Sequence, residues 1–309
     1  MLVFHFLSGT ANAQSCTPTN INGASLNFTC LQACADLNFQ IPDIRGTENY
    51  VVNSIPYNPL PYVTAAPALT LGCTSQDDKY FDITNIPFQF CFYGINYSQL
   101  SVSTNGAITF DIRNALRGSN YDLNAGVVLP YVGTGDQGSG VCPDPDANVR
   151  LPLAAIFGPF CDIFPQSGDP NYKIEARIEG TSPCSRYIIS FSRIPMYGCT
   201  NVRMTSQIVL YESTGVIDIF IESKPPCTSN GGLGIVGIQN SFAGTPAGLA
   251  VTAPGRGANN GAWSTTNEGW RFTPSGTTSN FVSSELYVLG STTPISTANI
   301  TTTTPGLIE

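Results

Sequence analysis

The chain contains one histidine, His5, which lies in an apolar N-terminal segment. Hydrolases built on a Ser–His–Asp or Cys–His arrangement need an imidazole to carry the proton. Histidine is also a common ligand of catalytic zinc. If His5 is removed with a secretory signal, the exported chain has no imidazole for either chemistry. Both classes of hydrolase are therefore excluded.

Carboxylate pairs are the other catalytic device that the sequence offers. Glycoside hydrolysis needs two Asp or Glu side chains across a cleft, one protonated and one ionised. Asp162 is flanked by Phe157, Phe160 and Phe164, and an apolar setting would raise its pKa. Turns favour aspartate for geometric reasons alone, so a structural role is the simpler interpretation. The candidates for a glycosidase pair are Asp162, Asp169, Glu212 and Asp218.

An acidic loop after Cys142 suggests a cation site, because alternating oxygen-bearing residues can surround one hard cation. An EF-hand is excluded, since Val149 stands where the loop glycine is needed and Ala155 where the bidentate glutamate is needed. An irregular calcium site remains the one cofactor hypothesis, and an ordinary acidic loop is its alternative. The candidate calcium ligands are Asp136, Asp144, Asp146 and Asn148.

Two tryptophans could contact a ligand. Trp270 alternates with Arg271 on a predicted strand, which indicates a core position. Trp263 follows a loop that contains Asn259 and Asn260, and loops carry binding residues more often than strands do. Trp263, Asn259 and Asn260 are therefore the candidate ligand-binding residues.

Ten cysteines are present, an even number, and no Cys-x-x-Cys spacing occurs. Without histidine a zinc site would need cysteines and carboxylates alone, so disulfide bonds are the stronger expectation. The connectivity stays open; Cys184 and Cys199, each near the end of a predicted strand, are one candidate pair. The candidates are Cys16, Cys30, Cys34, Cys73, Cys91, Cys142, Cys161, Cys184, Cys199 and Cys227.

The first residues fit an exported protein. An apolar run is followed by Ala11-Asn12-Ala13, the small-residue pattern that precedes signal cleavage. Residues 1–13 are interpreted as the remnant of a signal peptide; a buried N-terminal strand is the alternative. The expected location is secreted, either extracellular or on the outer cell surface.

Composition excludes further classes. Thirteen Lys and Arg against 21 Asp and Glu give 13 − 21 = −8 at neutral pH. Such an acidic chain lacks the basic footprint that nucleic-acid binding requires. No apolar run reaches the roughly 18 residues of a membrane span.

The elements that would position these residues are strands. In residues 172–179, apolar residues alternate with Lys173, Glu175, Arg177 and Glu179, which predicts a strand with one packed face and one wet face. Asn105-Gly106 predicts a hairpin turn with positive φ at both residues. Helical periodicity is not sustained anywhere.

The sequence therefore predicts an all-β fold, an antiparallel β-sandwich cross-linked by disulfides. The sandwich is expected over residues 14–276. Residues 277–309 are expected to be a Ser/Thr-rich linker and the first strands of a following immunoglobulin-like or PKD-like module.

Several strand-and-turn segments together carry a resemblance to known proteins. The segments are PFQFCFYG (87–94), STNGAITF (103–110), AIFGPF (155–160), CSRYIISF (184–191), QIVLYE (207–212), GIVGIQN (234–240) and NEGWRFTP (267–274). Together they resemble the N-terminal part of large surface proteins of Bacteroidota, which the type IX secretion system exports and which are associated with gliding motility. The arrangement is also similar to the nidogen-type domain of animal matrix proteins, and the likeness covers roughly residues 28–276.

The resemblance implies a secreted, cell-surface β-domain that opens a long modular chain. We expect a non-enzymatic adhesion or structural domain whose partner is an extracellular glycan or protein, with further β modules continuing the chain. A carbohydrate-binding module is the first alternative function, and a carboxylate-pair glycosidase is the second.

Overall fold

The computed structural model describes residues 41–43, 45–71, 77–123, 125–131, 151–165, 172–182, 184–240, 249–278, 283–286, 292–293, 296–299 and 306–308. Strands dominate these residues, and the three helices among them are short 3-10 turns: η1 (Ile112–Asn114), η2 (Ser229–Gly232) and η3 (Ala258–Asn260). In this described part, no helix has the length and apolar character that crossing a membrane would take.

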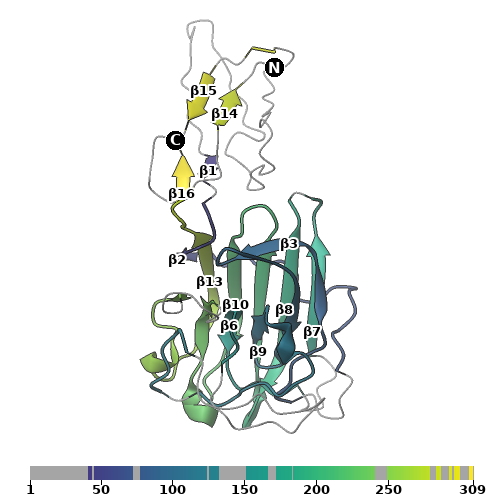
Figure 1. Ribbon diagram of the computed structural model, residues 1–309. Helices are drawn as coiled ribbons and strands as arrows, with labels where there is room; N and C mark the ends of the chain where they lie inside the picture. Colours follow the sequence, from purple (N-terminus) through teal and green to yellow (C-terminus); the bar gives the residue numbers. More distant parts are fainter. Residues whose placement is uncertain are drawn as a thin grey trace, which may run out of the picture.

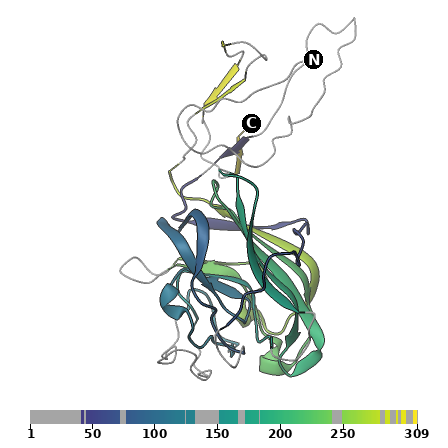
Figure 2. The ribbon, with the colours of Figure 1, turned by 90° about the vertical axis from the view of Figure 1, so that its right-hand side faces the viewer.

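Two six-stranded antiparallel sheets pack face to face, as predicted (Figures 1 and 2). The β9 sheet has the order β2-β13-β10-β9-β8-β7, and the β6 sheet has the order β12-β11-β6-β5-β4-β3. The β9 sheet contains β2 (Tyr50–Ile55), β7 (Lys173–Glu179), β8 (Arg186–Met196), β9 (Cys199–Tyr211), β10 (Ile217–Lys224) and β13 (Thr265–Pro274). The β6 sheet contains β3 (Thr84–Phe92), β4 (Ile95–Val102), β5 (Ala107–Thr109), β6 (Ala155–Phe160), β11 (Ile235–Gln239) and β12 (Ala250–Thr252).

The main hydrophobic core lies between the sheets. Along β3, buried and exposed side chains alternate, and Phe88, Phe90 and Phe92 point inward. Such alternation is the burial pattern of a strand that packs on one face. On the opposite sheet Trp270 and Phe272 are buried, which confirms the core position predicted for Trp270.

The outer face of the β9 sheet is also covered, because the segment 56–71, here called the strap, runs across it. Gln207 holds the strap at two points: Leu60 N–H donates to its Oε1 at 3.0 Å, and its Nε2 donates to Leu60 O at 3.1 Å. Glu175 accepts from Thr64 N–H at 3.2 Å, and Lys173 Nζ donates to Thr64 O at 2.9 Å.

The expectation of a wet face on β7 is therefore wrong for two of its four charged residues. Glu175 is 0% exposed and Arg177 is 9% exposed. Arg177 pairs with Glu175 at 2.9 Å and donates to Pro61 O at 2.7 Å, so the strap and this ion pair replace solvent. Buried charges persist in proteins when they are paired and hydrogen-bonded in this way.

The outer face of the β6 sheet is covered at β5, β6 and β11, whereas alternate residues of β3 are exposed. Buried side chains of the sheet, such as Phe157 and Ile235, pack against Leu123, Val127 and Leu151 from the loops that follow η1 and precede β6. Both sheets thus have apolar contacts on two faces, which explains the nearly continuous burial of β6.

The sandwich has two ends. At the terminal end the chain enters and leaves side by side: Gly276 N–H donates to Gly46 O at 2.8 Å, and Gly46 N–H donates to Thr278 O at 2.7 Å. At the opposite end lie the β8–β9 turn and the segment after β10; we call it the disulfide end.

Beyond the terminal end, β1 (Ile41–Asp43) pairs with β16 (Gly306–Ile308), and β14 (Ser283–Leu286) pairs with β15 (Ser296–Asn299) (Figure 1). Three of these strands fall in residues 277–309. The assignment of that region to a following module remains a prediction.

Candidate functional site

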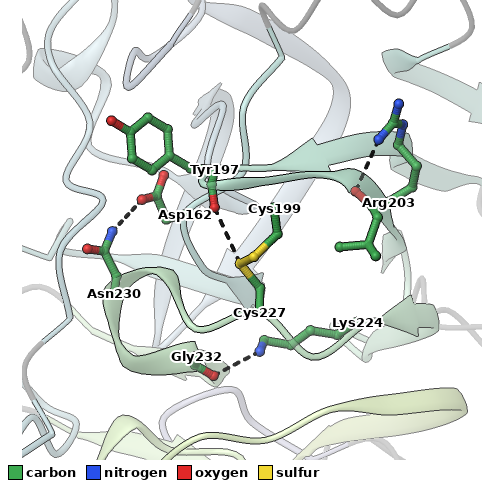
Figure 3. The surroundings of a disulfide bond; sticks show 9 residues. Asp162, Tyr197, Cys199, Arg203, Lys224, Cys227, Asn230 and Gly232 are labelled. Carbon is green, nitrogen blue, oxygen red and sulfur yellow. Dashed lines mark hydrogen bonds between the residues drawn. A yellow bond between two sulfur atoms is a disulfide. The ribbon is translucent and has the colours of Figure 1, made fainter.

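A disulfide bond joins Cys199, at the start of β9, to Cys227, just after β10 (Figure 3). Cys184 is also disulfide-bonded. The candidate pair Cys184–Cys199 is therefore wrong. Cys184 precedes β8 and Cys199 follows it, and a strand of 11 residues separates two such positions by ~35 Å.

Two further cysteines are free thiols, contrary to expectation. Cys161 is buried, its Sγ lies 3.4 Å from Met204 Sδ, and burial raises its pKa to about 11. Cys91 is half-buried, with its Sγ 2.9 Å from Thr47 Oγ1. The other candidates lie outside the described residues: Cys16, Cys30, Cys34, Cys73 and Cys142.

Four aspartates gather at the disulfide end and form what we call the acidic cluster: Asp77, Asp78, Asp122 and Asp162. They come from the loop before β3, the loop after η1 and the end of β6, and their charges act on one another. Asp78 and Asp162 are buried, whereas Asp77 and Asp122 are half-buried. The sequence identified Asp162 alone, because nothing in the local sequence brings these loops together.

Within the acidic cluster, the pKa values of Asp77, Asp78 and Asp162 are raised. Burial and then the neighbouring aspartates raise the pKa of Asp162 to about 8, and burial and Asp77 raise that of Asp78 to about 7. The predicted direction for Asp162 is confirmed, although the causes are burial and like charge together.

The other candidate carboxylates are engaged in internal contacts. Glu212 accepts from Ser182 Oγ at 2.7 Å and from Ser185 N–H at 3.0 Å. Burial opposes ionisation of Glu212, but these hydrogen bonds outweigh it and the pKa is lowered. Asp218 forms a two-point ion pair with Arg271. Asp169 lies outside the described residues.

Trp263 is half-buried and packs against the main core. Its Nε1 donates to Gly234 O at 2.9 Å, and two cations lie near its ring centroid, Lys224 Nζ at 4.4 Å and Arg256 Cζ at 4.9 Å. These contacts favour a packing role, since cations of the chain itself already lie against the ring.

The two asparagines near Trp263 are exposed. Asn259 and Asn260 belong to η3, and Asn260 Oδ1 accepts from Gly257 N–H at 3.0 Å, which closes the turn. The structure thus places Asn259 and Asn260 in the η3 turn and Trp263 three residues after it.

A polar cavity of about 290 Å³ lies at the terminal end. The sequence did not predict it. It is bounded by the segment that enters the sandwich, by β3 and by the β9–β10 turn. Its lining includes a cation, carboxylates, hydroxyls, an amide and the Cys91 thiol, a donor and acceptor set suited to a small polar ligand. Lining residues include Arg45, Thr47, Glu48, Gln89, Cys91 and Glu212.

The structure does not test the calcium hypothesis. Its candidates Asp136, Asp144, Asp146 and Asn148 lie outside the described residues. Within the described ranges, no group of three or more His, Cys, Asp or Glu side chains is placed to hold a metal ion.

Comparison with known proteins agrees with this picture. Residues 49–281, about three quarters of the chain, match the family described as NIDO related. No curated protein and no solved structure matches the chain. The match indicates an extracellular, non-catalytic domain. From the end of the loop that enters the sandwich to the residues just past β13, this chain belongs to the nidogen-related family.

Proposed function

We propose that this chain is a non-enzymatic adhesion or structural domain of a secreted, modular surface protein. The observation that carries the proposal is that the described side chains with catalytic potential are held by internal contacts. Asn230 donates to Asp162, two serines donate to Glu212, and Arg271 binds Asp218. Because part of the outer face of each sheet is covered, we assign partner binding to the loops at the two ends.

The same proposal includes the route of export, the cellular role and the partner. The sequence segments shared with surface proteins of Bacteroidota support export by the type IX secretion system and a role in gliding motility. They also support a chain that continues into further β modules and that binds an extracellular glycan or protein.

The full, oxidised chain displayed on beads tests the proposal. We expect saturable attachment to bacterial cells or to extracellular polysaccharide, and no turnover of a panel of glycosides, esters and peptides. The measurement is repeated with calcium and with EDTA, which tests the irregular calcium site. Hydrolysis that scales with the amount of protein would overturn the non-enzymatic assignment.

Carbohydrate binding is a second candidate, and the polar cavity favours it. Sugar hydroxyls need paired donors and acceptors, which hydroxyl, amide and carboxylate side chains supply. The residues that the sequence singled out for this role, Trp263, Asn259 and Asn260, lie elsewhere and stay candidates.

A glycan array separates these two sites. If the cavity binds sugar, Gln89→Ala weakens binding, whereas Asn259→Ala leaves it unchanged. If the η3 region binds instead, Asn259→Ala weakens binding and Gln89→Ala does not. An array without saturable binding by the unaltered chain excludes this candidate.

A further inference from the structure

Tyr197 presents an aromatic ring to solvent at the disulfide end. It lies in the β8–β9 turn and is 47% exposed, which is the largest exposed fraction among the aromatic side chains that the structure describes. Phe164 packs edge-on against it, with ring centroids 5.7 Å apart and an interplanar angle of 84°. A tyrosine of this kind offers an apolar face and a polar tip together, which is why tyrosine is enriched at binding surfaces.

The ring is held in place by the segments around it. Tyr197 N–H donates to Asp162 O at 3.2 Å, and Phe164 N–H donates to Pro195 O at 2.7 Å. The disulfide bond begins two residues after the ring, at Cys199. Because the turn is fixed before any ligand arrives, binding to the ring would cost little further ordering of the chain.

Polar side chains from two further loops lie beside the ring. Asn230, in η2, donates its side-chain amide to the Asp162 carboxyl group, and both lie on the same side of the disulfide as the Tyr197 ring (Figure 3). Burial and then charged neighbours raise the pKa of Tyr121, and Asp122 and Tyr197 are among these neighbours. The loop after η1 therefore also reaches the ring.

These polar groups can pair with hydroxyls. A side-chain amide has two N–H donors and one carbonyl acceptor, and Asn230 gives an N–H to Asp162. Asn230 and Asp122 are half-buried, so each also meets solvent. A sugar offers the matching surface, since its hydroxyls both donate and accept while its C–H groups form an apolar face for an aromatic ring.

The charges at this end favour an uncharged sugar. The four aspartates of the acidic cluster lie here, Lys79 is 1% exposed, and the Arg203 side chain points away from Tyr197 (Figure 3). A uronic acid or a sulfated sugar would carry the same sign of charge as the aspartates and would be repelled. An uncharged sugar avoids this cost.

We propose that the disulfide end carries a binding site for an uncharged sugar, in which the Tyr197 ring stacks on the sugar while Asn230 and Asp122 bind its hydroxyls. The inference rests on the proposed function, because it takes a glycan as the partner of the domain. It places the sugar at a third position, away from the polar cavity and from Trp263.

A glycan array and a titration test the site. The unaltered, oxidised full chain is run on an array of neutral and acidic glycans, and the neutral oligosaccharide with the strongest signal is titrated calorimetrically. Tyr197→Ala should raise the Kd about tenfold or more, because truncating an aromatic anchor removes most of its contact area. Tyr197→Phe keeps the ring and should stay within about threefold of the unaltered chain.

Two further variants complete the set. Ile178→Ala is the matched control, because Ile178 is 46% exposed but lies on β7, and it should leave the Kd unchanged. Asn230→Gly removes the amide and tolerates the left-handed backbone of this position, φ 45°, so it should raise the Kd about fivefold. If Tyr197→Ala does not fold, as judged by urea unfolding, Asn230→Gly decides.

The outcomes separate this site from the proposed function. Attachment to cells without binding to any neutral glycan would overturn the sugar site and leave the adhesion domain standing, whereas absence of both would overturn the two together. Sugar binding that Gln89→Ala or Asn259→Ala weakens, and that Tyr197→Ala leaves unchanged, would place the site elsewhere and overturn the inference. A preference for acidic glycans would overturn it as well.

Discussion

The Asp218 side chain on β10 is 1% exposed and has a cationic partner, Arg271. Arg271 reaches it with two nitrogens, each at 2.7 Å, and Tyr211 donates its hydroxyl at 2.8 Å. Ion pairing with Asp218 raises the pKa of Arg271 further above its usual range. A buried carboxylate in this position depends on its cation.

Replacing Arg271 with alanine should therefore destabilise the fold. The variant leaves Asp218 buried with one hydroxyl donor, and breaking a buried ion pair costs a few kcal/mol. Because the Arg271 side chain is 36% exposed, we expect the lower part of that range, a fall of about 2–3 kcal/mol in the free energy of unfolding, measured by urea denaturation.

Arg113→Ala is the matched control. Arg113 also makes a two-point contact with an aspartate, Asp111, but its side chain is 79% exposed. Water can replace this guanidinium, so the change should stay within about 0.5 kcal/mol. Equal effects of the two substitutions would show that burial of Asp218 does not matter.

Among the elements, the β4–β5 turn shows how a local signal can be right about the element and wrong about its geometry. Asn105-Gly106 does connect two antiparallel strands. The φ angle is positive at Gly106, +85°, but not at Asn105, so the predicted pair of positive φ angles is wrong. Asn105 uses its side chain instead to bind Asp78 and Ile163.

Gly106→Ala should disrupt this turn by two effects. A positive φ costs a non-glycine residue about 1 kcal/mol or more, and the new Cβ would lie 2.1 Å from Pro159 O. Gly255, with φ +73° and open space around a Cβ, supplies the control for the first effect alone. We expect Gly255→Ala to cost about 1 kcal/mol and Gly106→Ala at least twice that in urea unfolding. Similar costs would show that Pro159 moves aside.

The Cys199–Cys227 bond is the element that fastens the disulfide end. It closes a loop with a sequence separation of 28 residues, and the loss of such a cross-link destabilises a fold by about 3–4 kcal/mol in the chain-entropy account. Cys199→Ser with Cys227→Ser should lower the free energy of unfolding by this amount. Cys91→Ser, which breaks no disulfide, is the comparison, and a double variant as stable as Cys91→Ser would contradict the expectation.

Strand positions were predictable because alternation of polar and apolar residues is a local signal, and it placed Trp270 and the β7 strand correctly. The strap was not predictable: residues 56–71 contain four prolines and no period, and their partners lie more than a hundred residues away. From the sequence pattern alone, the charged face of β7 is expected to be solvent-exposed, because the pattern does not identify the segment that covers it. The acidic cluster and the polar cavity could not be predicted for the same reason, because each is assembled from loops that are distant in sequence.

For the molecule as a whole, opposing titrations should place the stability maximum at mildly acidic pH. Burial opposes ionisation of Glu175 and Glu268, but hydrogen bonds from Lys173 and Arg256 outweigh it and lower their pKa values. Stability from these groups is present above the unfolded pKa of about 4.5 and is lost as the pH falls. The raised pKa of Asp162 has the opposite sign, so its contribution is lost as the pH rises toward about 8.

Urea unfolding at pH 3, 5.5 and 8.5 measures this balance. We expect the free energy of unfolding to be highest at pH 5.5 and lower at both extremes. Glu175→Gln should weaken the fall on the acid side, because it removes one group whose protonation drives that fall. A stability that rises steadily from pH 3 to 8.5 would contradict the raised pKa values at the disulfide end.

The side-by-side passage of the chain at the terminal end has a mechanical consequence. β2 and β13 are antiparallel neighbours, with Tyr50 opposite Pro274, and both connect to the flanking segments at the same end. Tension between those segments would load the ladder of hydrogen bonds one rung at a time, as in a zipper, instead of shearing all rungs together. The domain would hang beside the line of tension as a branch, with β2 and β13 as the first strands to yield.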